Sequence, residues 1–379
     1  MTTLRVIVDQ IVAPVPGGIG RYAEELTRAL IQTAPPGCVV DGIVSASTEA
    51  DYQKINTLLP GLGNLYKSPL ARRELAAAWQ FGFTVLPGKG MVHATSMLAP
   101  LYRHDPVNDP GNQTAITIHD TVPWTHPQTL TPRGVSWHKA MAARAYKYAD
   151  AVVVVSHTVA DELTQYYDFG ERVRVISGAP SSKLAVPLDA SERAVQLGLP
   201  ERYILAVGTL EPRKGLEPLI RSLALPQTGD LPLIVVGPQG WGGVDLDTVA
   251  RDAGLAEGRV RALGQLSDSD LAVVMSRAIA LVYPSLSEGF GLPVVEAFSL
   301  GTPVIHSDAP ALLEVAADAS VVVERSDADG YPERLADAIG RVAGDSKLRD
   351  RLKYLGLDRS KAFSWRASAE KVWQLHADL

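Results

Sequence analysis

The sequence predicts an α/β protein with two doubly wound domains, each built on a parallel sheet with helices on both faces. Short, nearly continuous apolar runs alternate with amphipathic helical stretches, which is the pattern of strands buried on both sides. This pattern breaks off after Gly178 and restarts near residue 203. The chain of 379 residues is also too long for one average domain and fits two of roughly 150 to 200 residues each.

Residues 1–180 are expected to form the first, Rossmann-like domain. Its strands are predicted in six apolar runs: LRVIVD, CVVDGIVSA, GMVHATS, TAITIHD, AVVVVS and RVRVISG. Helical stretches such as RYAEELTRALIQ and GVSWHKAMAARAYKYA lie between them. An irregular stretch, GAPSSKLAVPLDASERAVQLGLP, follows and has the composition of a connection between domains.

Residues 181–362 are expected to form the second Rossmann-like domain. Six further runs predict its strands: YILAVG, LPLIVVG, RVRALG, AIALVY, TPVIH and SVVVE. A last helical stretch, residues 363–379, carries apolar side chains, and we expect it to pack back on the first domain. Two such domains that face each other would bring the carboxyl ends of their strands to a deep interdomain cleft, where ligands bind in these folds.

Composition excludes several classes of protein. A net charge of -6 and a pI near 5.8 argue against a nucleic-acid binder. The single cysteine, Cys38, excludes internal disulfides and CxxC metal sites, and its apolar surroundings indicate a buried, inert thiol. The first residues lack a charged leader with an apolar core, and no apolar run reaches about 18 residues. We therefore expect a cytoplasmic protein.

Basic and aromatic side chains in the first half permit peripheral contact with the inner face of a membrane through the N-terminal domain. They are Arg72, Arg73, Trp79, Phe81 and Phe83, followed by Trp137, His138, Lys139, Arg144 and Lys147. Ordinary amphipathic helices explain the same residues equally well.

The most informative stretch is YPSLSEGFGLPVVEAFSLGTPV, residues 283–304. An apolar strand leads through a glycine-broken loop into a helix that begins at Pro293 and ends at Gly301. The N-terminus of such a helix suits a phosphate or a developing negative charge. Glu288 in the loop and Glu296 on the helix flank this anion site, so we expect them to bind hydroxyls, as on a sugar or a ribose.

Cations are predicted beside this helix. The first strand of the second domain ends in VGTLEPRKGL, where Arg213 and Lys214 follow a proline turn and precede a helix. Arginine binds phosphate oxygens with a fork of donors, and lysine adds a compact charge. The glycines of the VGPQGWGG run, after the next strand, indicate a further loop lining the same cleft.

Two more strand ends carry candidate residues. The run VPGGIGRYAEEL predicts a flexible loop at Gly17, Gly18 and Gly20, before a helix starting near Arg21, that can meet a phosphate or a sugar. The run HDTVPW places His119 and Asp120 at a strand end, where the pair can orient a substrate hydroxyl or stabilise a developing charge, or where His119 is simply a satisfied histidine. His93 ends an earlier strand and is interpreted as a packing or acceptor contact.

The run LGQLSDSDL resembles a metal-binding DxD motif at Asp268 and Asp270. An apolar-periodic helix follows, so Ser267 or Asp268 is better interpreted as a helix N-cap. We therefore predict no catalytic metal. Arg213, Lys214 and the helix terminus would supply the positive charge instead.

Together these motifs resemble those of the retaining nucleotide-sugar glycosyltransferases with the GT-B fold, the E-x7-E group of glycosyltransferase family 4. The runs GTLEPRKG, YPSLSEGFGLPVVEAFSLGTPV, GGIGRY, HDTVP and VVSHTVADEL carry the resemblance, which is strongest from residue 203 to 325. The sequence looks closest to the bacterial mannosyltransferase-like members, and the resemblance spans nearly the whole chain.

The resemblance implies a role for each matching residue of the second half. Glu288 matches the glutamate that contacts hydroxyls of the donor sugar near the reacting carbon, and Glu296 matches the one that holds the ribose. Arg213 and Lys214 match the basic pair that neutralises the leaving diphosphate. Thr209 departs from the pattern, because many relatives have an arginine there, so phosphate binding is expected to rely more on Arg213.

The resemblance also implies that residues 1–180 bind the acceptor and residues 181–362 bind the nucleotide-sugar donor, and it assigns the remaining candidates. Phe290, Gly291 and Leu292 match the loop whose amides face the donor sugar and phosphate. Gly18 matches the glycine loop near the phosphates or the acceptor, and His119 matches the histidine near the 6-hydroxyl of the donor sugar.

The implied reaction transfers a hexosyl group from a nucleoside diphosphate sugar to a hydroxyl of a glycan, glycolipid or small molecule, with retention and without cofactor or metal. GDP-mannose is favoured by the resemblance, while the residues themselves leave the base, the sugar and a sugar or lipid-linked acceptor open. Two other classes also stay open. One is a non-catalytic nucleotide-sugar binding protein. The other is an NAD-dependent oxidoreductase, although the dinucleotide glycine spacing is missing.

Overall fold

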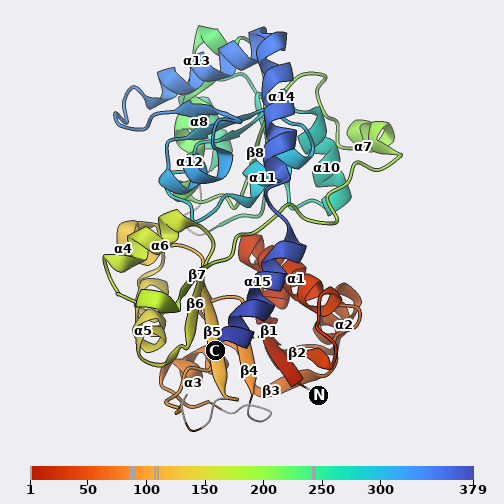
Figure 1. Ribbon diagram of the computed structural model, residues 1–379. Helices are drawn as coiled ribbons and strands as arrows, with labels where there is room; N and C mark the ends of the chain where they lie inside the picture. Colours follow the sequence, from red (N-terminus) through yellow and green to blue (C-terminus); the bar gives the residue numbers. More distant parts are fainter. Residues whose placement is uncertain (1, 85–89, 106–107, 109–110, 241–244) are drawn as a thin grey trace. The chain divides into compact units, whose positions relative to one another are not determined.

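The computed structural model describes residues 2–84, 90–105, 108, 111–240 and 245–379. The chain divides into two compact units (Figure 1). Unit 1 comprises Met1–Gly178 together with Ser364–Leu379, and unit 2 comprises Ala179–Phe363. The last helix of the chain therefore belongs to the same unit as the first strand.

Unit 1 is built on a seven-stranded parallel sheet in the order β3-β2-β1-β4-β5-β6-β7. Every residue of β5 and β6 is buried, as expected of strands covered on both faces. The winding changes direction between β1 and β4, which is where doubly wound sheets open a ligand crevice at their carboxyl edge. The strands are β1 (Thr2–Ile7), β2 (Cys38–Ala46), β3 (Leu65–Ala71), β4 (Met91–Ala94), β5 (Gln113–Ile118), β6 (Ala151–Val154) and β7 (Val173–Val175).

Two helices from opposite ends of the chain pack together in unit 1. They are α1 (Gly17–Gln32) and α15 (Trp365–Asp378) (Figure 1). The indole N–H of Trp373 on α15 donates a hydrogen bond of 3.2 Å to the carbonyl oxygen of Leu30 on α1. The other helical elements are α2 (Glu49–Leu58), α3 (Arg72–Gln80), α4 (Val122–Thr125), α5 (Pro132–Tyr148), α6 (His157–Thr164), η1 (Asp9–Val12), η2 (Pro127–Thr129) and η3 (Gly170–Arg172).

One strand of unit 1 was not predicted. β3, with the sequence LYKSPLA, pairs with β2 and forms an edge of the sheet. Edge strands tolerate lysine and proline because one side of their backbone needs no partner. Lys67 and Pro69 interrupt β3, so it lacks the continuous apolar run that identifies an inner strand. His93 and His119, predicted at the ends of the third and fourth strands, therefore lie in β4 and directly after β5.

The first helix begins earlier than predicted. Gly17, Gly18 and Gly20 do not form a loop before a helix near Arg21, because α1 begins at Gly17 and includes them in its first turns. A Cβ atom at Gly20 would lie 2.4 Å from Cβ of Pro16, so only glycine allows the chain to turn this tightly into the helix. Gly20 thus serves close packing at the helix start, whereas a Cβ atom at Gly17 would meet nothing within 4 Å.

Unit 2 contains a six-stranded parallel sheet in the order β10-β9-β8-β11-β12-β13. All six strands predicted for the second half are confirmed, and the two-sheet α/β fold class is confirmed with them. The winding changes direction between β8 and β11. The strands are β8 (Ile204–Val207), β9 (Leu233–Val236), β10 (Val260–Gly264), β11 (Ala280–Tyr283), β12 (Val304–Ser307) and β13 (Val321–Val323).

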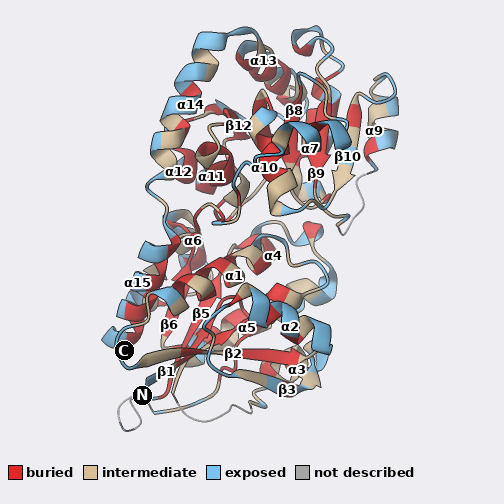
Figure 2. Cartoon of the chain, turned by 90° about the vertical axis from the view of Figure 1, so that its right-hand side faces the viewer, coloured by how far each residue is buried: buried red, intermediate tan, exposed pale blue. Residues whose placement is uncertain are grey.

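Helices cover the sheet of unit 2, and the buried residues gather in the strands and in the helix faces that contact them (Figure 2). The helix predicted after Lys214 and the helix predicted from Pro293 are both present. The helical elements are α7 (Ala190–Gln196), α8 (Leu216–Ser222), α9 (Leu246–Asp252), α10 (Asp268–Arg277), α11 (Leu292–Ser299), α12 (Pro310–Ala316), α13 (Tyr331–Gly344), α14 (Ser346–Ser360), η4 (Pro212–Lys214) and η5 (Pro226–Thr228).

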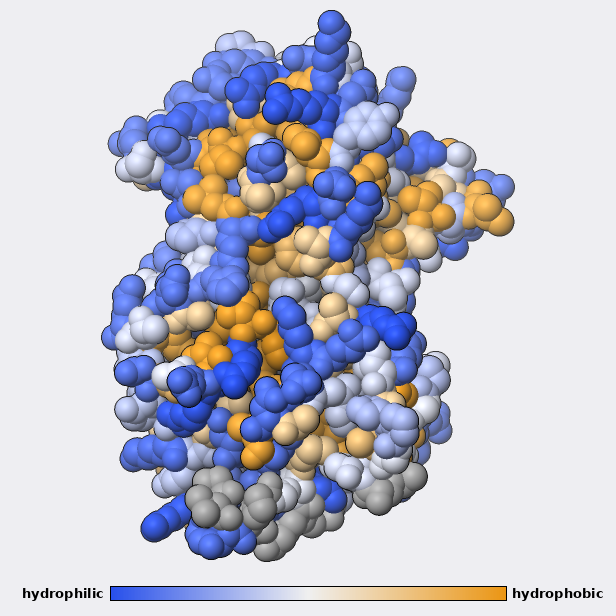
Figure 3. Space-filling view, viewed as in Figure 1, coloured by the Kyte–Doolittle hydropathy of each residue, from blue (hydrophilic) through white to orange (hydrophobic). Residues whose placement is uncertain are grey.

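The surface of unit 2 has an apolar projection around α7. Leu188 and Val195 are exposed there, and Figure 3 shows apolar side chains gathered over this projection at the right of the view. Across the part of the chain that the structure describes, no helix combines the length and the apolar character needed to cross a bilayer.

Candidate active site

The loop between β11 and α11 forms the centre of the candidate site in unit 2. α11 begins at Leu292, with Pro293 in its first turn and Gly291 as its N-cap residue. Gly291 has a φ of 93°, and a Cβ atom there would lie 2.6 Å from Cδ2 of Leu312. Glycine is therefore required both for the backbone conformation and for the available space. It lets the helix begin directly after a sharply turned loop.

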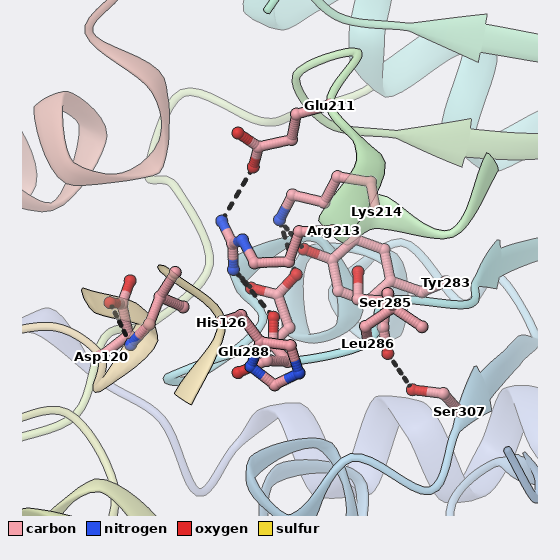
Figure 4. A network of polar contacts seen from close by, with 12 residues as sticks. Asp120, His126, Glu211, Arg213, Lys214, Tyr283, Ser285, Leu286, Glu288 and Ser307 are labelled. Carbon is pink, nitrogen blue, oxygen red and sulfur yellow. Dashed lines mark hydrogen bonds and ion pairs between the residues drawn. The ribbon is translucent and has the colours of Figure 1, made fainter. Parts of the chain in front are cut away.

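Hydrogen bonds from several elements hold this loop. The N–H of Leu286 donates to the carbonyl oxygen of Arg213 at 2.8 Å, and the hydroxyl of Ser307 donates to the carbonyl oxygen of Ser285 at 2.5 Å (Figure 4). The guanidinium of Arg325 also donates to the carbonyl oxygen of Leu286. A loop restrained by backbone contacts on both sides presents its side chains in a defined direction.

The predicted cations lie on η4, next to this loop. Gly215 follows them with a φ of 65°, and a Cβ atom there would lie 2.2 Å from the carbonyl oxygen of Pro284. This close approach of two backbone segments brings Arg213 and Lys214 against Glu288, which is 74 positions after Lys214 in the sequence.

Lys214 contacts two side chains of the loop and strand. Its ammonium nitrogen lies 2.5 Å from Oε1 of Glu288 and 3.1 Å from the hydroxyl oxygen of Tyr283 (Figure 4). All three side chains are largely buried. Buried charges of this kind are stable only when they are paired and hydrogen-bonded, as they are here.

Arg213 is held from three directions. Its Nη1 donates to the carbonyl oxygen of Ser287 at 2.8 Å and lies 3.5 Å from Oε2 of Glu288. Its Nη2 donates to Oε1 of Glu211 at 2.9 Å. The guanidinium is thus fixed in orientation beside Lys214, and the two cations share one carboxylate, that of Glu288.

The charges of this cluster shift the pKa values of its members. Burial alone would raise the pKa of Glu288, but the nearby charges of Lys214 and Arg213 outweigh it and lower the pKa to about 2. Burial lowers the pKa of Lys214, and the charge of Glu288 opposes this shift. Burial and the Glu288 charge raise the pKa of Tyr283 well above its usual value. Glu288 is therefore a carboxylate at neutral pH, and Tyr283 is a neutral phenol.

This arrangement can stabilise an anion. The start of α11 is the positive end of the helix dipole, although Pro293 has no N–H and the N–H of Val294 already donates to the carbonyl oxygen of Gly291 at 2.9 Å. Arg213 and Lys214 add two cations in the same unit, offset by the carboxylates of Glu211 and Glu288. A phosphate that displaced these carboxylates as the partner of the cations would leave Glu288 able to accept hydrogen bonds from hydroxyls.

The structure places the other predicted residues of the loop in different environments. Phe290 is buried, and its ring packs edge-on against that of Phe363 with 5.4 Å between centroids. Its side chain therefore serves packing, which leaves its amide for the role implied by the family resemblance. Leu292 is the first residue of α11, and Glu296 is buried on the same helix.

His119 and Gly18 lie in unit 1. His119 follows β5, and its Nε2 lies 2.8 Å from the carbonyl oxygen of Thr95. A carbonyl only accepts, so Nε2 carries the proton and Nδ1 is an acceptor. The ring also packs edge-on against Tyr22, with 4.8 Å between centroids, and burial lowers the pKa of His119. Gly18 lies in the first turn of α1.

The predicted helix cap after β10 is confirmed. Ser267 is the N-cap of α10, and its hydroxyl accepts a hydrogen bond of 3.1 Å from the N–H of Asp270. Among the described residues, no group of three or more metal-ligating side chains lies close together. His93 is buried in β4, with its ring near that of His376. The end of the VGPQGWGG run, residues 241–243, lies outside the described residues.

Sequence reasoning missed Tyr283 and the residues that hold the loop. Tyr283 is the last residue of β11, and strand ends in a parallel sheet point toward the ligand edge, so its position was a usable signal. Arg325 and Ser307 follow or end later strands, and no local motif marks them. Their contacts depend on which loops are neighbours in the folded sheet.

Two family models match the chain. The model for glycosyl transferases group 1 matches residues 189–358, and the model for glycosyltransferase family 4 matches residues 16–179. Together they cover nearly all of both units. The chain belongs to these glycosyltransferases. The expected resemblance is thereby confirmed.

Curated relatives of this glycosyltransferase include bacterial mannosyltransferases. It is 30% identical over 261 residues to O-antigen chain mannosyltransferase B of Escherichia coli, which covers 66% of each protein. It is 28% identical over 350 residues to O-antigen chain mannosyltransferase RfbU of Salmonella typhimurium, covering 86% of this chain and 89% of the relative. It is also 32% identical over 248 residues to D-inositol 3-phosphate glycosyltransferase of a Nocardioides species, covering 60% of this chain and 53% of the relative.

Solved structures show that the glycosyltransferase has the GT-B fold. Sucrose-phosphate synthase from Thermosynechococcus elongatus superposes with a TM-score of 0.75 at 23% identity, covering 100% of this chain and 99% of that one. Anabaena HepE in complex with UDP-glucose superposes with a TM-score of 0.74 at 18% identity, covering 100% of both chains. The likeness extends over the whole chain, so both sheets are part of it.

Proposed function

We propose that this glycosyltransferase is a retaining mannosyltransferase that transfers a mannosyl group from GDP-mannose to a hydroxyl of a glycan acceptor. Two relatives named as O-antigen chain mannosyltransferases, at 30% and 28% identity, support the sugar and the glycan acceptor. GDP-mannose is proposed as donor because the family resemblance favours it. The single structural observation that carries the proposal is the buried contact of Arg213 and Lys214 with Glu288 beside the start of α11.

In the proposed reaction, the bond between the anomeric carbon of mannose and the β-phosphate oxygen of GDP breaks. The electron pair goes to the phosphate, and GDP leaves with an additional negative charge. The acceptor hydroxyl forms the new bond on the same face and gives its proton to the departing phosphate oxygen. Stabilisation of the leaving group is therefore the main electrostatic task of the protein.

Each candidate residue has a role in this scheme. Arg213 and Lys214 neutralise the diphosphate, and the amides of Gly291 and Leu292 add donors at the start of α11. Glu288 accepts hydrogen bonds from hydroxyls of the mannosyl group, and its low pKa keeps it ionised for this purpose. Glu296 binds the ribose.

For Gly18, in unit 1, we propose the role that the family resemblance implies, which is contact with the phosphates or the acceptor. His119 offers Nδ1 as an acceptor to the 6-hydroxyl of the donor sugar, because its Nε2 is engaged by Thr95.

The reaction is proposed to need neither a metal ion nor another cofactor, because two fixed cations can take the place of Mg²⁺ at the diphosphate. Turnover after exhaustive treatment with EDTA should then equal turnover in added MgCl₂. A large drop that Mg²⁺ restores would disprove metal independence and leave the transferase assignment standing.

The decisive experiment is a donor screen followed by product analysis. Thermal shift with GDP, UDP, dTDP and ADP, and with their sugars, should give the largest stabilisation with GDP-mannose. NMR of the product made from GDP-mannose should show an α-anomeric mannoside, the configuration of the donor. A β-mannoside would refute retention, and binding without turnover or donor hydrolysis would indicate a non-catalytic nucleotide-sugar binding protein.

We also propose a cytoplasmic enzyme that contacts the membrane surface through unit 1. Phe81 and Phe83, after α3, are 71% and 73% exposed and can insert at an interface. Trp79 was predicted among the residues that permit membrane contact, but it is buried and cannot take part in such contact. Co-sedimentation with vesicles of anionic lipid should be strong for the wild type and weak for Phe81→Ser/Phe83→Ser, with Tyr354→Ser in unit 2 as an exposed aromatic control. Equal sedimentation of all three proteins would refute membrane contact.

A further inference from the structure

A cavity of about 600 Å³ lies in unit 1 at the amino edge of its sheet. It is lined by residues at the start of β5, at the end of α5 before β6, and in η3 before β7. Its volume is in the range typical of small-molecule sites, roughly 300 to 1,000 Å³. Doubly wound sheets bind their substrates at the carboxyl edge, so this cavity lies at the opposite edge from the substrate crevice.

Three cationic side chains line this cavity: Arg103, Lys147 and Arg172. Among the described residues, none of the three forms an ion pair with a carboxylate. The chain carries a net charge of -6, so a hollow with three such cations is opposite in sign to the protein as a whole. A concave site lined by one sign of charge attracts counter-ions, because the low-dielectric walls focus its field.

Arg172 is held in a fixed orientation. Its guanidinium donates hydrogen bonds to the carbonyl oxygens of Ala149 at 2.9 Å, Tyr146 at 3.0 Å and Phe169 at 3.3 Å. Its central carbon also lies 5.7 Å from the ring centroid of Tyr146 and 5.4 Å from that of Phe169. These contacts orient the guanidinium without neutralising its charge. They use three of its five N–H groups, so donors remain for a ligand.

The one acidic side chain among the described lining residues, Asp150, is already engaged. Its Oδ2 accepts a hydrogen bond of 2.7 Å from the N–H of Thr114, and both of its oxygens lie 3.0 Å from Nε2 of His104. Nδ1 of His104 lies 3.1 Å from the carbonyl oxygen of Tyr102, so both ring nitrogens face acceptors, an arrangement that the doubly protonated ring satisfies. Asp150 is therefore paired with His104 and does not neutralise the three cations.

We propose that this cavity binds a small dissolved molecule that carries a phosphate group, at a site separate from those of the sugar donor and the acceptor. Arg172 offers oriented donors to phosphate oxygens, and the exposed side chains of Arg103 and Lys147 add two positive charges. A phosphate monoester carries about two negative charges at neutral pH and three acceptor oxygens, so it matches three cations better than a single carboxylate does.

Calorimetric titration with inorganic pyrophosphate tests the proposal. Arg213 and Lys214 of unit 2 also suit a diphosphate, so the wild type should show two binding sites. Lys147→Glu should weaken one site about tenfold or more, because a charge-assisted contact is replaced by repulsion, and should leave the other unchanged. Lys214→Ala should show the reverse pattern, with the site of unit 1 unchanged.

Lys54→Glu is the matched control, because Lys54 is an exposed lysine of α2 that does not line the cavity. It changes the charge of unit 1 by the same amount and should keep both sites. Arg103→Ser, in a segment without regular secondary structure, should weaken the same site as Lys147→Glu without affecting a helix. Melting temperatures show that each variant is folded. Equal titrations of Lys147→Glu and Lys54→Glu, or loss of all pyrophosphate binding in Lys214→Ala, would overturn the inference.

Vesicles distinguish a dissolved phosphate from the phosphate of a lipid headgroup, which offers the same chemistry. Phe81→Ser/Phe83→Ser, which removes the two exposed phenylalanines of unit 1, should lose sedimentation with phosphatidic acid vesicles and keep both pyrophosphate sites. Sedimentation that Lys147→Glu abolishes, in a protein that binds no pyrophosphate in unit 1, would assign the cations to a lipid and reject a dissolved ligand.

Sugar transfer tests whether the site is separate from the chemistry. In buffer without phosphate, Lys147→Glu should transfer sugar at the wild-type rate, because the cavity lies at the amino edge of the sheet and Lys147 belongs to neither proposed substrate site. A folded Lys147→Glu protein that loses transfer together with pyrophosphate binding would show that the cavity serves the reaction itself, which contradicts the proposal.

Discussion

The ammonium nitrogen of Lys214 lies 2.5 Å from Oε1 of Glu288, although 74 positions separate the two residues. The contact is largely buried and also includes Tyr283 and Arg213. Two cations and one ionised carboxylate therefore share a site at the start of α11. Substitutions of these side chains, or of the loop that positions them, are therefore expected to change turnover or stability.

Replacement of Lys214 tests the electrostatic task directly. Lys214→Ala should lower kcat for sugar transfer by on the order of 100-fold, because a fixed donor to the developing charge is lost. Lys347→Ala, which removes an exposed lysine from α14, should keep wild-type turnover. Initial rates at saturating donor give the comparison, and near-normal turnover of a folded Lys214→Ala protein would remove this residue from the mechanism.

Tyr283 is expected to position Lys214. Tyr283→Phe removes the hydroxyl that accepts from the buried ammonium at 3.1 Å, so turnover should fall about tenfold, as for the loss of roughly 1.4 kcal/mol. Tyr203→Phe is the matched control, because the buried Tyr203 hydroxyl donates to the carbonyl oxygen of Val274 at 2.6 Å. It should lower stability and keep turnover. Equal turnover of wild type and Tyr283→Phe would show that Lys214 is oriented without the phenol.

The pKa of Glu288 predicts how stability depends on pH. Its folded-state pKa of about 2 lies below the usual 4.5, so the ionised carboxylate stabilises the fold above about pH 4.5 and this contribution is lost as pH falls toward 2. Glu288→Gln should therefore be less stable than the wild type by about 3 kcal/mol at pH 7, and the difference should shrink between pH 5 and pH 3.

Denaturant unfolding of both proteins across this pH range measures the difference. Glu217→Gln is a suitable control, because Glu217 forms an exposed pair with Arg221. Exposed pairs contribute little, so this variant should match the wild type within about 1 kcal/mol. A difference between wild type and Glu288→Gln that stays constant from pH 7 to pH 3 would contradict the lowered pKa.

Gly291 should be intolerant of any side chain. Gly291→Ala combines a φ of 93° with a Cβ atom 2.6 Å from Leu312, whereas Gly254→Ala combines a φ of 73° with open space. Gly254→Ala should cost about 1 kcal/mol of strain, and Gly291→Ala about 3 kcal/mol of strain and overpacking. Thermal unfolding gives both values.

The same substitution at Gly291 should also weaken donor binding. Because Gly291 precedes the first turn of α11, Gly291→Ala should raise the KM for the donor, and Gly254→Ala should leave it unchanged. Equal stability and equal KM for the two variants would show that the loop adapts to a Cβ atom at Gly291.

Much of the fold follows from local sequence patterns. The six strands of unit 2 were all predicted, because inner parallel strands are continuous apolar runs whose character does not depend on distant residues. β3 escaped prediction because an edge strand needs apolar side chains less and tolerates Lys67 and Pro69. The start of α1 was misplaced because glycines commonly signal a loop, whereas Gly20 lies inside the helix and allows close packing against Pro16.

The candidate residues were predictable in kind and less so in their contacts. Glu288, Arg213 and Lys214 each stand in a recognisable turn or loop at a strand end. Nothing local indicates that Gly215 must approach the carbonyl oxygen of Pro284, or that Arg325 holds Leu286. These contacts arise between strands that are neighbours in the sheet and distant in the chain.

The sequence by itself determined two parallel sheets, a helix that starts at a glycine-proline turn, and two cations and two carboxylates in the same half of the protein. Apolar periodicity and turn chemistry act over a few residues, so they can be read in order along the chain. Only the tertiary structure decided that Lys214 meets Glu288 and Tyr283, and that three cations of unit 1 line one cavity. The pairing of side chains depends on which backbone segments pack closely, and that depends on the whole sheet.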